Sequence, residues 1–304
     1  RDICVLDPGQ ICIIKLNKIK VLNNECFKYE KNNLSLNNNI SYVIKSLKKA
    51  VNQRIEKTEG KVSFALSGGL DSRILLSLIS NRNKKKVVTH TLGDKNNFES
   101  TVAKKVSKEL GFKHKFYEIK KNDYYDLADN AVTEGSFNSI FKNGVKTKYT
   151  KIIKKRDKSQ FFMMGNALDV LIASSFSKKG IEKVKNLNSY IKWYKKTFLL
   201  FSLGELKKIF KKKIVIKNGE INRTIKNFIK KIKFDNDFIN LNDALTFETR
   251  IKRWHNFSLA EQSRITNFLI PTYDKNFLYF CSRIGSNYRF KDKFRKKLIF
   301  KINP

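Results

Sequence analysis

The segment Ser67-Gly68-Gly69-Leu70-Asp71-Ser72 constrains the fold more than any other part of the sequence. The apolar run before it, residues 62–66, is typical of a buried strand, and residues 73–79 follow as an apolar helix. Two consecutive glycines let the backbone turn sharply and approach a ligand closely. The helix that follows points its N-terminal N–H groups and positive dipole end at the same place. The strand–turn–helix order therefore predicts a phosphate-binding loop.

The elements around this loop predict an α/β fold. Helical spacing over residues 40–51 precedes it, and residues 100–110 form a second helical pattern that ends at Gly111. Further strands are expected at 87–92, 116–119 and 161–165. Strands that alternate with helices indicate a Rossmann-like parallel sheet with flanking helices and right-handed crossovers. Beyond residue 178 the chain is expected to be helical and rich in lysine.

The side chains of the loop indicate how a phosphate group would be held. The hydroxyl groups of Ser67 and Ser72 can donate hydrogen bonds to phosphate oxygens. The carboxylate of Asp71 would repel a phosphate unless a cation lay between them. An aspartate in this position therefore implies Mg²⁺, a hard cation that prefers oxygen ligands.

The charge of the chain is strongly positive, since 64 Lys+Arg against 27 Asp+Glu leave a net charge of +37. This charge favours polyanionic partners, so RNA is a candidate partner. The joint abundance of Lys, Asn, Ile and Phe is equally consistent with a general compositional bias. The Lys-rich runs at 207–213 and 226–233 fit either solvated helix faces or a phosphate-tracking groove. With 41% hydrophobic residues a disordered polycation is excluded, and no apolar run approaches the ~20 residues of a membrane span.

The four cysteines, Cys4, Cys12, Cys26 and Cys281, form no CxxC pair and no zinc pattern. We expect reduced thiols in a cytoplasmic protein. No signal peptide is visible. The chain begins at Arg1 rather than Met, so we expect it to be a fragment.

The loop resembles the SGGxDS motif of the PP-loop ATP pyrophosphatases. More of the chain resembles the synthetase domain of the asparagine synthetase family. Besides the loop, the segments that carry this resemblance are residues 6–10, 91–94, 165–169 and 271–274. By the resemblance, residues 1–39 are a short β-rich segment like the end of a glutaminase domain and its linker, and residues 40–304 are the ATP pyrophosphatase domain.

The resemblance also implies functional residues. It places ATP against Leu66, Ser67, Gly68, Gly69, Asp71, Ser72, Leu92 and Gly165. Asp169 would be the second Mg²⁺ ligand, facing Asp71. A lysine near the C-terminus would stabilise the charge that develops on the acyl-adenylate, and Lys293 and then Lys297 are the favoured catalytic candidates.

Three departures from the family pattern affect the substrate. Val170 stands where the family usually has a second acidic residue, and Asn267 and Leu269 stand where asparagine synthetases carry a Glu-x-Arg. These changes argue against aspartate as the substrate. The N-terminal cysteine of the family's glutaminase domain has no counterpart, because Cys4 is internal. Either that domain lies upstream and was removed, or ammonia or an amine comes from a separate glutaminase or another source.

The expected function is an ATP-dependent, amide-forming ligase that activates a carboxylate as an acyl-adenylate and releases pyrophosphate. The carboxylate would belong to a small molecule, a glycan or a peptide. Two alternatives stay open at this point. One is a PP-loop enzyme that modifies tRNA, which the positive charge favours. The other is a catalytically inactive relative, which the departures at Val170, Asn267 and Leu269 favour.

Overall fold

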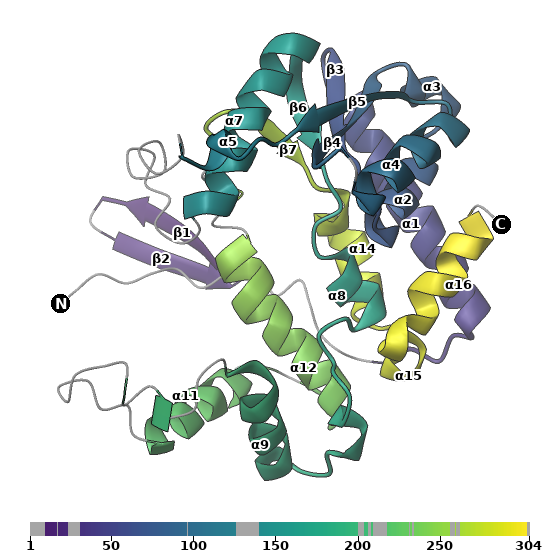
Figure 1. Ribbon diagram of the computed structural model, residues 1–304. Helices are drawn as coiled ribbons and strands as arrows, with labels where there is room; N and C mark the ends of the chain where they lie inside the picture. Colours follow the sequence, from purple (N-terminus) through teal and green to yellow (C-terminus); the bar gives the residue numbers. More distant parts are fainter. Residues whose placement is uncertain are drawn as a thin grey trace.

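A computed structural model describes residues 10–16, 18–23, 31–95, 97–125, 140–199, 204–205, 208, 218–230, 232, 234–255, 259 and 262–302. Its centre is a five-stranded sheet in the order β5-β4-β3-β6-β7, in which every neighbouring pair is parallel. Figure 1 shows this sheet with helices packed around it. The expected parallel α/β fold is confirmed. The strands are β3 (Lys61–Ala65), β4 (Val87–Gly93), β5 (Lys113–Glu118), β6 (Ser159–Met163) and β7 (Asn267–Leu269).

Alternate residues along the strands serve two hydrophobic cores. Val62 and Phe64 of β3 and Met163 of β6 enter the larger core, whereas Phe162 and Tyr117 enter a smaller one on the other face. This follows from the two-residue period of a strand, which sends successive side chains to opposite faces. Both faces are therefore covered, as is usual for a parallel sheet.

Helices of the larger core precede, follow and connect the strands on one face of the sheet. They are α1 (Leu36–Glu56), α2 (Leu70–Ser77), α4 (Phe98–Glu109), α8 (Leu168–Ala173), α14 (Lys275–Cys281), α15 (Ser286–Arg289) and α16 (Lys293–Ile302). The short helix α3 (Asn81–Lys84) leads from α2 to β4. α1 begins where the Ser35 hydroxyl accepts a hydrogen bond from the Asn38 N–H at 3.2 Å. α5 (Asn122–Tyr125) and α7 (Ile140–Asp157) lead from β5 to β6, and α7 packs on the smaller core.

The connection through α7 changes the direction in which the sheet grows. β3, β4 and β5 follow one another toward one edge, and the chain then crosses to the other side of β3 to form β6. The carboxyl ends of β3 and β6 are therefore a topological switch point. In open α/β sheets this is the usual place for a ligand.

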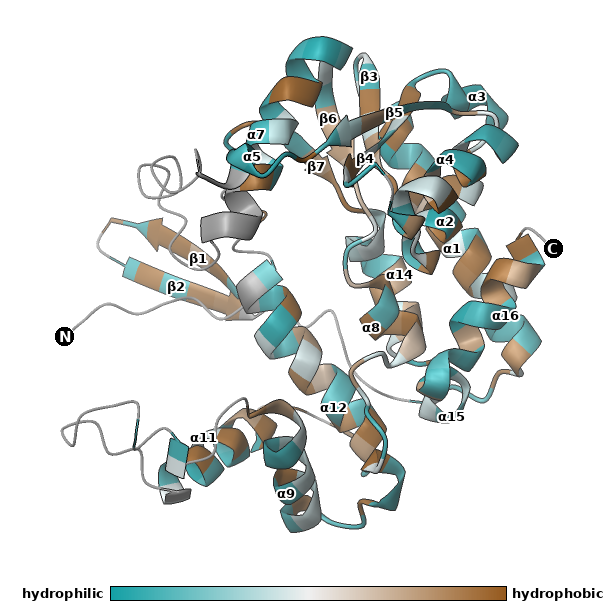
Figure 2. Cartoon of the chain, viewed as in Figure 1, coloured by the Kyte–Doolittle hydropathy of each residue, from teal (hydrophilic) through white to brown (hydrophobic). Residues whose placement is uncertain are grey.

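A separate group of helices lies beside the sheet domain, at the bottom of Figure 1. It comprises η1 (Ile181–Lys183), α9 (Leu187–Phe198), α11 (Asn218–Lys230) and α12 (Phe238–Thr246), and it has its own apolar core around Tyr190 and Leu241. Figure 2 shows apolar stripes on α11 and α12 with hydrophilic residues between them. The run at 226–233 thus begins in an amphipathic helix with charged residues on its open face. The run at 207–213 lies almost wholly outside the described residues.

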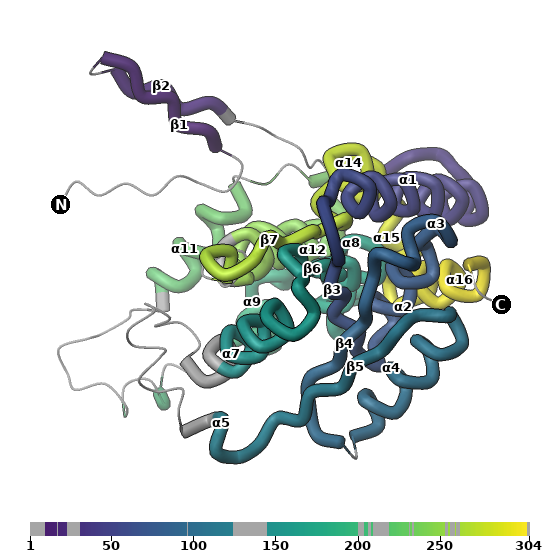
Figure 3. The backbone as a smooth tube through the Cα atoms, turned by 90° about the horizontal axis from the view of Figure 1, so that it is seen from above, coloured from purple at the N-terminus to yellow at the C-terminus, as the bar shows by residue number. Residues whose placement is uncertain are grey.

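After α12 the helix continues as η2 (Phe247–His255), a π-helix, and later segments are η3 (Pro271–Tyr273) and η4 (Phe290–Asp292). At the other end of the chain, β1 (Gln10–Lys15) and β2 (Lys18–Asn23) pair as an antiparallel hairpin. Figure 3 shows this hairpin projecting away from the rest of the molecule.

The predicted elements before residue 166 are present, with shifted ends. The strand expected at 116–119 begins earlier, at Lys113, and the strand expected at 161–165 begins at Ser159. β7 was not predicted, because a three-residue strand carries too little periodicity to be recognised. Among the described residues no helix is long and apolar enough to cross a membrane. Cys12 and Cys281 are free thiols, and Cys4 and Cys26 lie outside the described residues.

Candidate functional site

The phosphate loop joins the end of β3 to the start of α2, and its two serines are bonded to each other. The Oγ atoms of Ser67 and Ser72 lie 3.1 Å apart, and the Ser67 N–H donates to Ser72 Oγ at 3.2 Å. The Gly69 N–H donates to Ser67 Oγ at 3.2 Å. Gly69 is the N-cap of α2, and no side chain caps the helix. The first-turn N–H groups of α2 therefore face the loop with no side-chain acceptor, which suits an anion.

Two glycines at the site are required by close packing. A Cβ on Gly68 would lie 2.8 Å from the Cα of Glu99 in α4, and a Cβ on Gly165 would lie 2.7 Å from Cδ1 of Leu75 in α2. Gly165 follows β6, so the turn after β6 packs against α2, the helix that follows the loop, while the loop itself packs against α4. The structure thus brings together two glycine turns that are far apart in the sequence.

Asp71 and Asp169 lie side by side. The Asp71 carboxylate accepts a hydrogen bond from the Asp169 backbone and is destabilised by the Asp169 charge. Burial is the largest influence on both groups: it raises the pKa of Asp71 to about 6, against the effect of Arg295, and it also raises the pKa of Asp169. Two half-buried carboxylates at one place form a site that favours a cation.

Arg295 of α16 supplies positive charge to this pair. Its Nη1 donates to Asp71 Oδ1 at 2.7 Å, and the same guanidinium holds the carboxylate of Asp292 at 2.8 and 2.9 Å. These hydrogen bonds and charges raise the pKa of Arg295 despite its burial. Asp292 and Lys291 both have left-handed backbone conformations, with φ of 64° and 57°. The turn before α16 is therefore held in an uncommon conformation that presents Asp292 to Arg295.

A third segment supports the turn after β6. The Asn166 side chain donates to the Tyr273 hydroxyl at 2.7 Å, and the Thr272 hydroxyl donates to the Asn166 carbonyl at 2.5 Å. Ala167 has φ of 64° and is the N-cap of α8, whose first turn carries Asp169. Residues 271–274, one of the segments of the family resemblance, thus hold the turn that positions Asp169.

The remaining predicted residues take different places. Leu66 lies in the core, its N–H donating to the His90 carbonyl at 2.9 Å and its carbonyl accepting from the Thr91 hydroxyl at 2.6 Å. Leu92 is half-buried near the end of β4. Lys293 and Lys297 are exposed and one turn apart on α16. Neither lysine forms the contact with Asp71 that Arg295 forms.

Among the positions that depart from the family pattern, Val170 has a clear structural role. Val170 is 1% exposed and belongs to the main core, so its apolar side chain fits its surroundings. Asn267 and Leu269 lie on β7, opposite Phe161 and Met163 of β6. Leu269 is partly buried against the main core, whereas Asn267, at the start of this short strand, is exposed.

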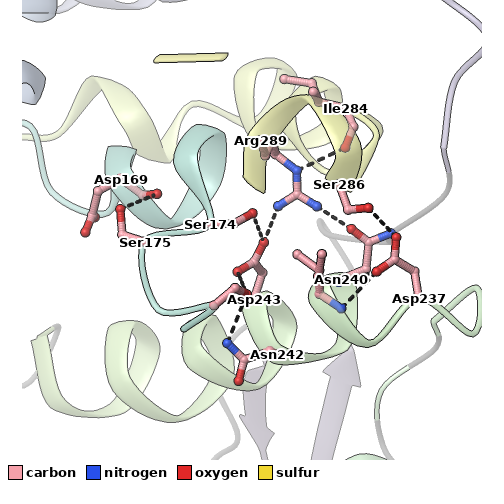
Figure 4. Close-up of polar contacts among 12 residues, drawn as sticks. Asp169, Ser174, Ser175, Asp237, Asn240, Asn242, Asp243, Ile284, Ser286 and Arg289 are labelled. Carbon is pink, nitrogen blue, oxygen red and sulfur yellow. Dashed lines mark hydrogen bonds and ion pairs between the residues drawn. The ribbon is translucent and has the colours of Figure 1, made fainter. Parts of the chain in front are cut away.

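A buried ion pair between Arg289 and Asp243, drawn in Figure 4, connects the separate group of helices with the segments that carry Asp169 and Arg295. Arg289 and Asp243 are both fully buried, and Asp243 also accepts hydrogen bonds from Ser174 and Ser177. Arg289 donates further to Asn240 and to the Ile284 carbonyl. Burial raises the pKa of Asp243, and the charge of Arg289 opposes this shift. The pair ties α12 to the end of α8, which carries Asp169, and to the segment that leads into α16.

Arg250 is a further cation near the site that the sequence did not reveal. It lies on the π-helix η2, stacks over the Phe176 ring at 4.7 Å, and its charge lowers the pKa of Asp169. Arg295 was not singled out either, although it is the one arginine in the run 291–297. The presence of a single arginine among these lysines could have indicated a buried carboxylate partner, because a guanidinium suits such a partner.

The residues present fit Mg²⁺ in the sense that Asp71 and Asp169 offer adjacent carboxylate oxygens in a half-buried setting. Within the described part of the chain, no group of three or more His, Cys, Asp or Glu residues could hold a metal. A protein site of two carboxylates matches Mg²⁺, which usually takes its remaining ligands from phosphate and water.

Residues 43–139 match the family model of asparagine synthase. This stretch contains the phosphate loop and runs from α1 past β5. It confirms, over these residues, the resemblance drawn from the motifs. Among curated proteins, none matches the chain significantly.

Solved structures with partial likeness include the U34-tRNA thiolase NcsA from Methanococcus maripaludis with its [4Fe-4S] cluster, at 16% identity and a TM-score of 0.33 over 77% of this chain and 80% of that one. The NH3-dependent NAD synthetase from Campylobacter jejuni has 13% identity and a TM-score of 0.32 over 71% and 96%. The NMN synthetase from Francisella tularensis has 16% identity and a TM-score of 0.33 over 76% and 97%. Likenesses this low assign no function to the chain.

Proposed function

We propose that the protein is an ATP-dependent, amide-forming ligase that activates a carboxylate as an acyl-adenylate. The observation that supports this most strongly is the approach of Asp169 to Asp71, a residue of the Ser67–Ser72 loop, at the switch point of the sheet. The match of residues 43–139 to asparagine synthase supports the same chemistry.

In the proposed reaction, a substrate carboxylate oxygen attacks the α-phosphorus of ATP, and the bond to pyrophosphate breaks. An ammonia or amine nitrogen then attacks the acyl carbon, loses a proton and displaces AMP. The carboxylate would come from a small molecule, a glycan or a peptide. The nitrogen would come from a separate glutaminase or another ammonia source.

The chain's own groups would bind the reactants and stabilise charge. Ser67 and Ser72, whose hydroxyl groups are hydrogen-bonded within the loop, would turn to donate to phosphate oxygens, and the N-terminal N–H groups of α2 would face the same anion. Asp71 and Asp169 would hold Mg²⁺, which when bound neutralises charge on the departing pyrophosphate. Lys293 remains the first candidate to stabilise the acyl-adenylate and Lys297 the second, because both stand on the helix that already reaches Asp71 through Arg295.

Exchange of labelled pyrophosphate into ATP, measured with a panel of carboxylates, tests this proposal. We expect exchange that requires both a carboxylate and Mg²⁺ and that disappears in Asp71→Asn. Mg²⁺-dependent ATP binding without exchange for any carboxylate would point to a different acceptor. Absence of ATP binding would instead favour the catalytically inactive alternative.

Modification of tRNA is a second candidate function, which the net charge of +37 favours. Titration of tRNA at several salt concentrations distinguishes the two proposals. Tight binding with a steep salt dependence, together with ATP consumption that requires tRNA, would support tRNA as the acceptor. If tRNA binds weakly, and no better than an unrelated polyanion, the result would support a ligase that acts on another carboxylate.

A further inference from the structure

The guanidinium of Arg295 is anchored on Asp292 and reaches Asp71 with one nitrogen only. Its Nε and Nη2 donate to the two carboxylate oxygens of Asp292 at 2.8 and 2.9 Å, which makes a forked pair. Nη1 donates to Asp71 Oδ1 at 2.7 Å. A guanidinium carries five N–H groups, so these hydrogen bonds leave it with further donors. The fork on Asp292 therefore holds the guanidinium in place, and the single bond to Asp71 is the one that can change partner.

The packing of α16 keeps Arg295 beside the carboxylate pair. Phe294 and Leu298 of this helix are fully buried in the main core. The helix packs against both α2 and α8, whose first turns carry Asp71 and Asp169. The side chains of Arg295 and Asp71 are only 16% and 23% exposed, so water and salt screen their attraction less than they would at the surface. The charge of Arg295 therefore acts on the site at short range and in a partly dry setting.

Arg295 is the counter-ion of both carboxylates that we propose to hold Mg²⁺. For Asp71 and for Asp169 alike, its charge is the largest influence that opposes the effect of burial on the pKa. Asp71 Oδ1 would accept a free divalent cation only by giving up the hydrogen bond from Nη1, next to a positive charge that stays in place. With a metal–phosphate complex the balance differs, because a phosphate oxygen can accept the N–H that Asp71 gives up.

We propose that Arg295 keeps the metal site closed to free Mg²⁺ and opens it to Mg²⁺ that enters together with phosphate. In this exchange Asp71 passes from Nη1 to the metal, and Nη1 donates instead to an oxygen of the phosphate chain, while the fork on Asp292 stays intact. The first-turn N–H groups of α2 face the same anion, so a phosphate bound there lies next to the carboxylate that Nη1 already contacts. The inference rests on the proposed function, in which this phosphate is the departing pyrophosphate.

A purely structural ion pair is the alternative. In that case Arg295 would only tie α16 to α2, and its loss would loosen the site and weaken every ligand. The proposed exchange predicts opposite effects on two ligands instead. Loss of Arg295 should strengthen binding of the metal alone and weaken binding of the metal with pyrophosphate.

Two binding measurements on the parent chain and on Arg295→Gln test the proposal. Electron paramagnetic resonance measures Mn²⁺ alone as a probe of the metal site, and calorimetry measures magnesium pyrophosphate. Both are made at about pH 8, above the value of about 6 to which burial raises the pKa of Asp71. In Arg295→Gln we expect Mn²⁺ alone to bind about threefold more tightly or better, because a nearby positive charge is gone. Magnesium pyrophosphate should bind about tenfold more weakly or worse, because a charge-assisted hydrogen bond is lost.

Two further variants separate charge from geometry. Arg295→Lys keeps the positive charge but cannot make the fork on Asp292, so it should bind Mn²⁺ like the parent chain and recover pyrophosphate binding only in part. Lys296→Gln removes one charge from an exposed neighbour on the same helix and should change neither affinity. Circular dichroism and thermal unfolding check that every variant is folded. None of these readouts requires turnover of a substrate.

Several outcomes would overturn the proposal. Weaker binding of both ligands by Arg295→Gln would assign the ion pair a structural role only. Equal changes in Lys296→Gln would show that total charge is responsible. If Arg295→Gln binds magnesium pyrophosphate like the parent chain, the role of Arg295 is wrong while the ATP site and the proposed function stand. If the parent chain binds neither ATP nor magnesium pyrophosphate, the proposed function fails, and the exchange at Arg295 fails with it.

Discussion

The guanidinium of Arg295 donates to the carboxylate of Asp71 at 2.7 Å, across 224 residues of sequence. This contact joins the last helix of the chain to the first turn of the helix that follows the phosphate loop. It places a fixed cation beside the two carboxylates that we propose to hold Mg²⁺. The ion pair therefore links substrate binding at the loop with the position of α16 and its candidate catalytic lysines.

Substitution of Arg295 by Gln should make Asp71 harder to ionise. Arg295 is the group that lowers the pKa of Asp71 most strongly, so its removal leaves burial and the Asp169 charge opposed mainly by the weaker effect of the Asp169 backbone hydrogen bond. We expect the midpoint of Mg²⁺-dependent ATP binding to move to higher pH, measured by calorimetry across a pH series. Lys296→Gln, an exposed neighbour on the same helix, should leave the midpoint unchanged. An unchanged midpoint in Arg295→Gln would contradict this account of the site.

Substitution of Asp71 by Asn should abolish the Mg²⁺ dependence of ATP binding. The amide keeps the shape of the carboxylate but loses its charge, and Arg295 keeps its contacts with Asp292. Calorimetric titration of ATP with and without Mg²⁺ measures the effect, and thermal unfolding should show a folded protein. Glu109→Gln, at the exposed end of α4, is the control for loss of one negative charge. Full Mg²⁺-dependent binding by Asp71→Asn would refute the metal assignment.

In the parent protein, the stability contribution of Asp71 and the Mg²⁺-dependent affinity for ATP should change with pH in opposite directions. Burial raises the pKa of Asp71 from 3.8 to about 6, so the folded state binds this proton more tightly than the unfolded state. The contribution of Asp71 to stability is therefore fully present below about pH 4 and falls as the pH rises through about 6. Metal binding needs the ionised form, so Mg²⁺-dependent ATP affinity should fall as the pH drops through about 6. Unfolding and calorimetric measurements between pH 4 and 8 on the same sample check both signs.

Substitution of Gly68 by Ala should damage the loop. The new Cβ would lie 2.8 Å from the Glu99 Cα, a backbone atom that cannot move without shifting α4. Relieving this contact costs about 1–3 kcal/mol, the usual range for overpacking, and it displaces the N–H groups that face the phosphate. We expect weaker ATP binding by calorimetry together with a lower melting temperature. Gly219→Ala in α11, where a Cβ meets no atom within 4 Å, should change neither quantity for the worse.

Substitution of Arg289 by Met should destabilise the protein strongly. It would leave Asp243 buried and without its counter-charge, and breaking a buried pair in this way costs about 3–5 kcal/mol. Chemical unfolding measures the loss. The double variant Arg289→Met/Asp243→Leu removes both charges and should recover much of it, whereas Arg82→Met on the surface should be neutral. A double variant no more stable than the single one would show that the pair does not act as a unit.

The sequence alone was enough to predict the sheet domain and the loop. The spacing of apolar residues in 62–66 and 87–92, with glycine turns between strands and helices, identifies a parallel α/β fold because these patterns are local. The same is true of the Ser67–Ser72 loop, in which the hydrogen bonds between the loop's own residues join groups within five positions of one another. The resemblance to asparagine synthase also rested on such contiguous motifs.

Only the tertiary structure decided which distant residues meet at the loop. Arg295 was hidden among the lysines of its helix, and its contact with Asp71 depends on how α16 packs against α2. The role of Val170 as a core residue, the strand β7 and the buried Arg289–Asp243 pair likewise depend on contacts between separate elements. Local patterns fix dihedral preferences and the burial of a face. Which charged side chain reaches a particular carboxylate is fixed by the packing of whole helices, and no short stretch of sequence records it.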